Sequence, residues 1–146
     1  MRKYLLIILS SLFLVSCNDE KAFIGDTPDE AIEKLETVFV QNMKDIQLVD
    51  INNEQKISIF RATALNENEL EYYAAYIEKK GKKWGVLEAF GVGNPTTTSS
   101  LSSGGNFLEA GFIRTTNTSS TPQFINGQYI FKLPNNQDSL WVEVLD

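Results

Sequence analysis

The spacing of apolar residues in the first third of the chain is that of an amphipathic helix. A capping sequence, Thr27-Pro28-Asp29-Glu30, supplies an N-cap hydroxyl, a proline for the first helical position and a glutamate three residues after the cap. Apolar residues then recur every three or four positions, at Ala31, Ile32, Leu35, Val38 and Phe39. We therefore predict a helix over residues 28–43.

After Met43 the apolar spacing changes to two, which is typical of strands. Residues 45–51 and 56–64 are predicted to form a hairpin around the polar turn at 52–54. Residues 70–79 allow two interpretations, because their Ala and Glu content suits a helix whereas three tyrosines and an isoleucine favour a strand. A short turn at Gly81 and a second apolar run over 84–90 make the hairpin the preferred interpretation.

The second half of the chain alternates between strand patterns and loops rich in Ser, Thr, Asn and Gly. Strands are predicted at 107–114, with Gly111 as a bend or bulge, and at 139–145. Between them, the Asn126-Gly127 pair predicts a hairpin or a tightly turned strand over 124–131. Residues 91–106 and 115–121 have loop composition.

These elements predict an α+β fold. One N-terminal amphipathic helix would pack on the concave face of a curled, mostly antiparallel sheet of six to seven strands. In the order of its elements this arrangement resembles the cystatin and NTF2 folds. We see no internal repeat, and the length after the leader suits a single domain over residues 27–146.

The first seventeen residues have the organisation of an export signal. Arg2 and Lys3 precede an apolar run over 4–15, which is shorter than the roughly 20 residues that a membrane-spanning helix needs. Leu14-Val15-Ser16-Cys17 resembles the lipobox of bacterial lipoproteins. The resemblance implies a diacylglycerol on the thiol of Cys17 and cleavage between Ser16 and Cys17, so that residues 1–16 are removed.

Two other interpretations of the N-terminus are an ordinary signal peptide and an N-terminal membrane helix with an incidental cysteine. Cys17 is the one cysteine of the sequence, so an internal disulfide is excluded and acylation would explain an odd exported thiol. Residues 17–26 are expected to be a lipidated tether. Phe23 and Ile24 within it either belong to this tether or dock on the domain.

The whole chain is similar to small lipoproteins of Gram-positive bacteria. The shared features are the signal, a short acidic tether, Thr27-Pro28-Asp29-Glu30-Ala31 at a helix start, and Ala110-Gly111-Phe112-Ile113 late in the chain. The resemblance implies a place at the outer leaflet of the cell membrane and no particular activity. Whether the envelope has one membrane or two is left open.

Composition excludes several classes of function. The net charge is −6, and it becomes −8 when Arg2 and Lys3 are removed with the leader, which disfavours nucleic acid as a partner. The sequence has no histidine, the commonest general base and transition-metal ligand. With Cys17 acylated, no Cys/His metal cluster or Ser-His-Asp triad is available, and we expect no cofactor or metal.

Two glutamates are candidates for chemistry. Glu88 and Glu109 each interrupt an apolar strand pattern, where burial would raise the pKa of a carboxyl group and prepare it for acid–base catalysis. Alternating strand positions often face water instead, which would leave both glutamates ordinary.

The aromatic and basic side chains of the central hairpin also have two interpretations each. Tyr72, Tyr73, Tyr76 and Trp84 either line a ligand groove or form sheet core, and core is the commoner use. Four lysines gather around Gly81, at 79, 80, 82 and 83. They either contact anionic lipid headgroups or cell-wall polymer, or form a solvated turn whose charges prevent the sheet edge from pairing with another molecule.

The function expected from the sequence is therefore a non-enzymatic binding or protein-interaction module. It would be held at the extracytoplasmic face of the cell membrane by lipid on Cys17, with an unknown protein or envelope ligand as partner. The alternative is a carboxylate-dependent envelope hydrolase that uses Glu88 and Glu109. A purely structural spacer is not distinguished from the first hypothesis by sequence.

Overall fold

The computed structural model describes residues 23–36, 38–95, 102–114, 119–134 and 137–146. Of these described residues, 63% lie in strands and 5% in helix. The strands are β1 (Ile24–Gly25), β2 (Val40–Asp50), β3 (Gln55–Ala64), β4 (Leu70–Lys80), β5 (Lys83–Gly93), β6 (Ser103–Gly104), β7 (Leu108–Arg114), β8 (Gln123–Ile125), β9 (Gln128–Lys132) and β10 (Asp138–Val144), and the helix is α1 (Pro28–Glu33).

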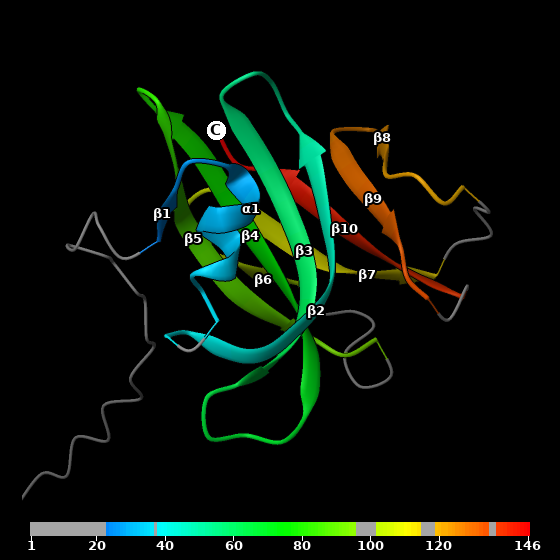
Figure 1. Cartoon of the computed structure of the whole chain (residues 1–146). Helices are drawn as coiled ribbons and strands as arrows, with labels where there is room; N and C mark the ends of the chain where they lie inside the picture. The colour runs from blue at the N-terminus through cyan, green and yellow to red at the C-terminus, as the bar shows by residue number, and fades with distance from the viewer. Residues whose placement is uncertain (1–22, 37, 96–101, 115–118, 135–136) are drawn as a thin grey trace, which may run out of the picture.

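The strands form two five-stranded antiparallel sheets (Figure 1). Sheet A has the order β1-β5-β4-β3-β2, so the four long strands follow one another as a meander and β1 is added at one edge. Sheet B has the order β6-β7-β10-β9-β8, in which the last strand of the chain lies between β7 and β9. The protein therefore belongs to the all-β class, with two stacked sheets.

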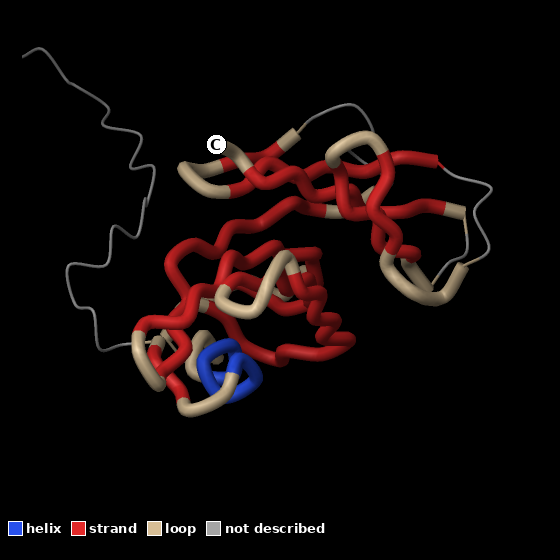
Figure 2. Tube along the Cα trace, turned by 90° about the horizontal axis from the view of Figure 1, so that it is seen from above, coloured by secondary structure: helices blue, strands red, loops and turns tan. Residues whose placement is uncertain are grey.

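Two hydrophobic clusters hold the layers together. The first lies between the sheets and joins Ile57, Ile59 and Tyr76 of sheet A to Leu108, Phe131 and Leu140 of sheet B, among others. The second covers the opposite face of sheet A. Figure 2 shows α1 on this face, so that sheet A lies between sheet B and the helix. Its members include Ala31, Ile32 and Leu35 at and after α1, and Phe60 and Ile77 of the sheet.

Strand β4 is buried on both of its faces. Tyr72, Ala74 and Tyr76 belong to the cluster between the sheets, whereas Tyr73 and Ala75 belong to the cluster beneath α1. Because neither face meets water, this strand has a continuous apolar run and no alternation of apolar and polar residues. The strand interpretation of residues 70–79 is confirmed, as is the hairpin with residues 84–90.

The predicted helix over 28–43 is wrong in its length. The N-cap is confirmed, because the backbone N–H of Glu30 donates to Thr27 Oγ1 over 3.2 Å. The glutamate of the capping sequence accepts from the backbone N–H of Asp26 (2.7 Å). Helix α1 ends at Glu33, and from Val40 the chain is strand β2, paired with β3.

The helix is followed by a turn, in which the backbone N–H groups of Phe39 and Val40 donate to the carbonyl of Leu35 over 2.8 and 3.1 Å. Strand pairing begins only at Val40, which lies opposite Ala64 at the start of the β2–β3 ladder. Val38, which the helical pattern places on the buried side, is 58% exposed. Since no helix of seven or more residues is present in the described ranges, the predicted α+β fold with a packed amphipathic helix is wrong. The likeness to cystatin and NTF2 folds, which rested on that helix, no longer applies.

The predicted hairpins of the first sheet and the late strands agree with the structure. Residues 45–51 and 56–64 lie in β2 and β3, and residues 139–145 largely in β10. Asn126 and Gly127, with φ of 51° and 84°, form the turn between β8 and β9. These positive φ values at both turn residues are those that a two-residue hairpin requires.

The segment before α1 docks on the domain. Ile24 pairs with Gly85 and Gly25 with Trp84, and the carbonyl of Phe23 accepts from the backbone N–H of Val86 over 3.1 Å. The side chain of Phe23 is buried in the cluster beneath α1. Of the two interpretations of Phe23 and Ile24, docking is therefore the one that the structure has, and the folded domain extends at least to Phe23.

The signal and lipobox, including Leu14, Val15, Ser16 and Cys17, lie outside the described residues. Within the described ranges, no helix is long and apolar enough to cross a membrane.

Candidate functional site

The carboxylate of Glu88 binds a turn of the other sheet. Glu88 lies on β5 opposite Tyr76, on the face of sheet A that meets sheet B. It accepts hydrogen bonds from the backbone N–H groups of Asn106 (2.5 Å), Phe107 (3.0 Å) and Leu108 (3.0 Å). Three successive N–H groups around one carboxylate form an anion-binding turn whose anion is part of the protein. Glu88 thus joins β5 to the turn between β6 and β7.

Glu109 lies on the opposite side of sheet B from Glu88. Its neighbours Leu108 and Ala110 are buried between the sheets, so the intervening Glu109 points outward. There it accepts from Ser102 Oγ over 2.6 Å and lies opposite Glu143, which accepts from Gln128 Nε2 over 3.2 Å. The structure therefore does not bring Glu88 and Glu109 together.

The four candidate aromatic residues are divided between the two clusters. Tyr72 and Tyr76 lie between the sheets, whereas Tyr73 and Trp84 lie beneath α1. All four are at most 8% exposed, so the structure places them in the sheet core and does not assemble them into one groove. Consecutive residues of a strand point to opposite faces, which is why Tyr72 and Tyr73 are separated.

Burial sets the ionisation of these tyrosines. Tyr73 stacks on Phe60 with ring centroids 5.4 Å apart, and burial, followed by the nearby charge of Glu71, raises its pKa to about 12. Burial also raises the pKa of Tyr72 and of Tyr76. All three hydroxyls are therefore more firmly protonated at neutral pH than an exposed tyrosine, which suits structural side chains.

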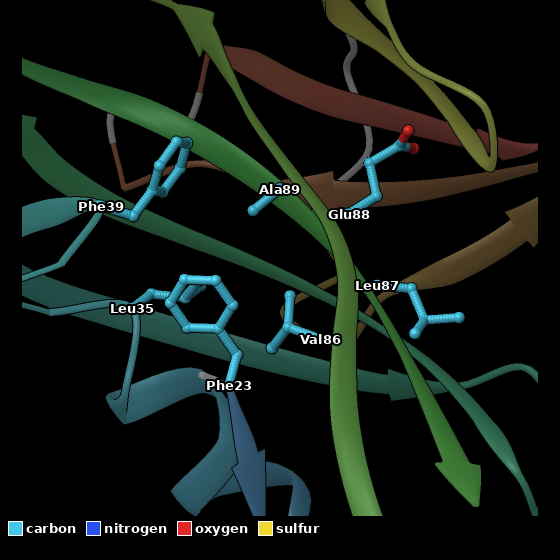
Figure 3. A pocket seen from close by; sticks show the side chains of 7 residues that line it. All are labelled: Phe23, Leu35, Phe39, Val86, Leu87, Glu88 and Ala89. Carbon is cyan, nitrogen blue, oxygen red and sulfur yellow. The ribbon is translucent and has the colours of Figure 1, made fainter. Parts of the chain in front are cut away.

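A small apolar pocket lies on the α1 side of sheet A (Figure 3). Phe23, Leu35, Phe39, Val86 and Ala89 surround it, while the side chains of Leu87 and Glu88 point away from them. The free interior is about 20 Å³, which holds little more than one water molecule. This pocket is a packing gap in the second cluster and too small for an organic ligand.

The outer face of sheet B carries a group of apolar side chains that the sequence pattern did not single out. We define this outer face by Gly111, Ile113, Ile125, Ile130 and Trp141. Trp141 lies opposite both Gly111 and Ile130, so the three share one face. Ile113 and Ile125 are 45% and 46% exposed, and Ile130 and Trp141 are partly exposed.

The expected bend or bulge at Gly111 is not found. The register between β7 and β10 is unbroken through Gly111, and a Cβ atom built there would lie 2.9 Å from the indole ring of Trp141. Glycine is therefore used because the indole crosses the strand at this point. Glu109, Glu143, Gln128 and Lys132 alternate with the apolar side chains and give this face polar neighbours.

The four lysines around Gly81, which we call the lysine tip (Lys79, Lys80, Lys82 and Lys83), end the β4–β5 hairpin. Gly81 has a φ of 65°, and all four lysines are exposed. Lys79 lies over the Trp84 ring, 5.7 Å from its centroid.

Lys83 forms an ion pair with Asp26, and the hydrogen bond and charge of Lys83 lower the pKa of the Asp26 carboxyl. This pair connects the lysine tip to the segment between β1 and α1.

No group of three or more His, Cys, Asp or Glu side chains suited to a metal ion is found in the part of the chain that the structure describes. Comparison with known proteins finds no family model, no curated protein and no solved structure that matches the chain.

Proposed function

We propose that this protein is a lipid-anchored extracytoplasmic lipoprotein that acts as a non-enzymatic binding module for another protein of the cell envelope. The anchor is supported by the sequence Leu14-Val15-Ser16-Cys17, in which every position suits a lipobox. Phe23, six residues after Cys17, is already docked on the domain, so the two stacked sheets would be held close to the lipid. Acyl chains on Cys17 would hold the protein by burial of hydrocarbon.

The outer face of sheet B is the observation that carries the binding role. Scattered exposed apolar side chains are ordinary, but here a tryptophan and three isoleucines share one side of a single sheet. A partly exposed aromatic ring among aliphatic residues with polar neighbours is the composition of a protein–protein interface. A protein partner is therefore the occupant that this surface suits.

The anchor is tested by cell fractionation of the full-length protein and of its Cys17→Ala variant. We expect the unchanged protein in the membrane fraction with a covalent lipid label, and the variant without the label and no longer held by acyl chains. A Cys17→Ala protein that keeps the lipid label would contradict the anchor.

The binding role is tested by photo-crosslinking in intact cells, from a probe at Gln123 beside the outer face. A discrete protein adduct should disappear when Ile113 and Ile125 are both changed to Ser. The matched control is Ile46→Ser, because Ile46 is 41% exposed on sheet A. An adduct that survives the double change, or is lost equally in the control, would refute binding through this face.

The carboxylate hydrolase needs two carboxylates that converge on one substrate. Glu88 and Glu109 lie on opposite sides of sheet B, and Glu88 is held by three backbone N–H groups. Because the two carboxylates do not converge, their geometry does not support this reaction.

A further inference from the structure

The topology places the lysine tip beside the point where the anchored chain enters the fold. Strand β1 pairs with the first residues of β5, with Gly25 opposite Trp84, and Lys83 is the residue before Trp84. The ion pair between Lys83 and Asp26 joins the start of β5 to the residue that follows β1. In Figure 1 the end of the β4–β5 hairpin lies above β1 at the same side of the molecule.

The length of chain between the lipidation site and the domain keeps this edge near the membrane. From Cys17 to Phe23 there are six residue steps, which span at most about 20 Å when fully extended. Ile24 pairs with Gly85, two residues from Lys83, or about 7 Å along a strand. The lysine tip therefore stays within roughly 35 Å of an anchor at Cys17, when the step from Phe23 to Ile24 (about 3 Å) and the spacing of the paired strands (about 5 Å) are added to these two spans.

The lysines differ in how far they are engaged by the protein. Lys83 is paired with Asp26 and Lys79 lies over Trp84. Lys80 and Lys82 flank Gly81 at the apex and are exposed. Three acidic residues lie beside the tip: Asp26 pairs with Lys83, Glu78 precedes Lys79 on β4, and the carbonyl of Glu54 accepts from the backbone N–H of Lys79 over 2.7 Å.

From this placement we propose that the lysine tip contacts the phosphate groups of anionic lipid headgroups in the same leaflet that holds the acyl chains of Cys17. The proposal rests on the proposed lipid anchor. Each lysine close to an anionic membrane surface favours contact roughly five-fold, so the two apical lysines together give a bias of about 25-fold. The contact would fix the orientation of the sandwich on the membrane, with the β4–β5 hairpin toward the lipid.

The experiment attaches the mature chain from Cys17 to vesicles through a maleimide lipid, which couples to the one thiol of the sequence. The vesicles contain phosphatidylcholine alone or with about a third phosphatidylglycerol, and a trace of headgroup spin label. Paramagnetic broadening of the Gly81 amide is compared with that of Gly127, the tip of the uncharged β8–β9 turn. Anionic vesicles should broaden Gly81 far more than Gly127, and added salt should remove the difference.

The decisive variant is Lys80→Gln with Lys82→Gln, and its control is Lys44→Gln with Lys132→Gln, which removes the same charge elsewhere. We expect broadening at Gly81 to fall at least five-fold in the first protein and to stay within two-fold in the second. Equal broadening in neutral and anionic vesicles, or equal loss in both variants, would overturn the proposal.

Chemical coupling bypasses lipidation in the cell. A failure of this experiment would therefore refute the membrane contact of the lysine tip alone. The anchor is tested separately, by fractionation of the Cys17→Ala variant.

Discussion

At the scale of single residues, the most informative contact is the carboxylate of Glu88 in the turn between β6 and β7. Its Oε1 atom lies against Gly105, where an added Cβ would overlap it. The φ of Gly105 is outside the left-handed region, so alanine suits the backbone there and only the carboxylate opposes it. The carboxylate of Glu88 can therefore occupy its position only because residue 105 has no side chain.

This arrangement predicts a strong coupling between two substitutions. Glu88→Ala removes three charge-assisted hydrogen bonds at a partly exposed site and should lower the free energy of unfolding by about 1–3 kcal/mol. Gly105→Ala should cost a similar amount in the unchanged protein, because its Cβ displaces the carboxylate. In the Glu88→Ala background the same glycine change should cost almost nothing.

Urea unfolding of the four proteins of this cycle measures the coupling. Glu109→Ala is the control for loss of a strand glutamate, since Glu109 keeps one side-chain contact on the outer face of sheet B. Additive effects of the Glu88 and Gly105 changes would show that the carboxylate does not hold the turn.

The role of Glu88 could not be predicted from sequence patterns, because its hydrogen-bond partners are far from it along the chain. The apolar neighbours of Glu88 correctly indicated a strand, but its partners lie 18–20 residues later in a turn of unremarkable composition. The same holds for Gly111, whose partner Trp141 lies thirty positions downstream. A local pattern shows which residues alternate and gives no information about which strand lies opposite.

At the scale of elements, the contact between β1 and α1 depends on a glycine. A Cβ built at Gly25 would lie 2.6 Å from the backbone nitrogen of Ala31 and 2.6 Å from the Cβ of Glu30. Gly85 sits across the same pair of strands, but the nearest atom to a Cβ there is 3.8 Å away. These two glycines therefore offer a matched comparison.

We predict that Gly25→Ala destabilises the fold by about 1–3 kcal/mol, because backbone atoms of α1 must move to admit the methyl group. Gly85→Ala should change stability by less than about 0.5 kcal/mol, since it meets only ordinary contacts. Thermal and urea unfolding of both variants measures the difference. Similar stability for the two proteins would mean that α1 is not packed against β1 as described.

The elements that the sequence predicted well are those in which local preference and tertiary pairing agree. The β3–β4–β5 meander has short turns and β-favouring residues, and its strands were recognisable. The predicted helix over 28–43 was too long because Leu35, Val38 and Phe39 continue the helical spacing of apolar residues, although the structure has them in a turn. From Val40 the chain pairs with β3, and a partner on another strand is not visible in the segment itself.

At the scale of the whole molecule, neither the presence of two sheets nor their stacking followed from the sequence. The final strand β10 pairs with β7 and β9, so sheet B is completed only when the end of the chain is inserted between earlier strands. The double burial of β4 explains why a second sheet is required: one face meets α1 and the other needs a cover of its own. The outer face of sheet B, as a surface, exists only through this assembly.

Because β4 contributes to both clusters, the sandwich should unfold as one cooperative unit. The two tryptophans of the sequence report separately on its parts, since Trp84 lies beneath α1 and Trp141 on the outer face of sheet B. In Trp141→Phe and Trp84→Phe variants, the fluorescence midpoint in urea should coincide with the midpoint measured by circular dichroism.

Phe131→Leu supplies the sharper version of this test. Phe131 is fully buried between the sheets, and its loss of volume should cost about 1–2 kcal/mol. If loss of packing on sheet B is transmitted through β4, the Trp84 signal on the far side of sheet A must shift by the same amount as the Trp141 signal. A Trp84 transition that stays in place while the Trp141 transition moves would show two separately stable layers, and would contradict cooperative unfolding of the two clusters through β4.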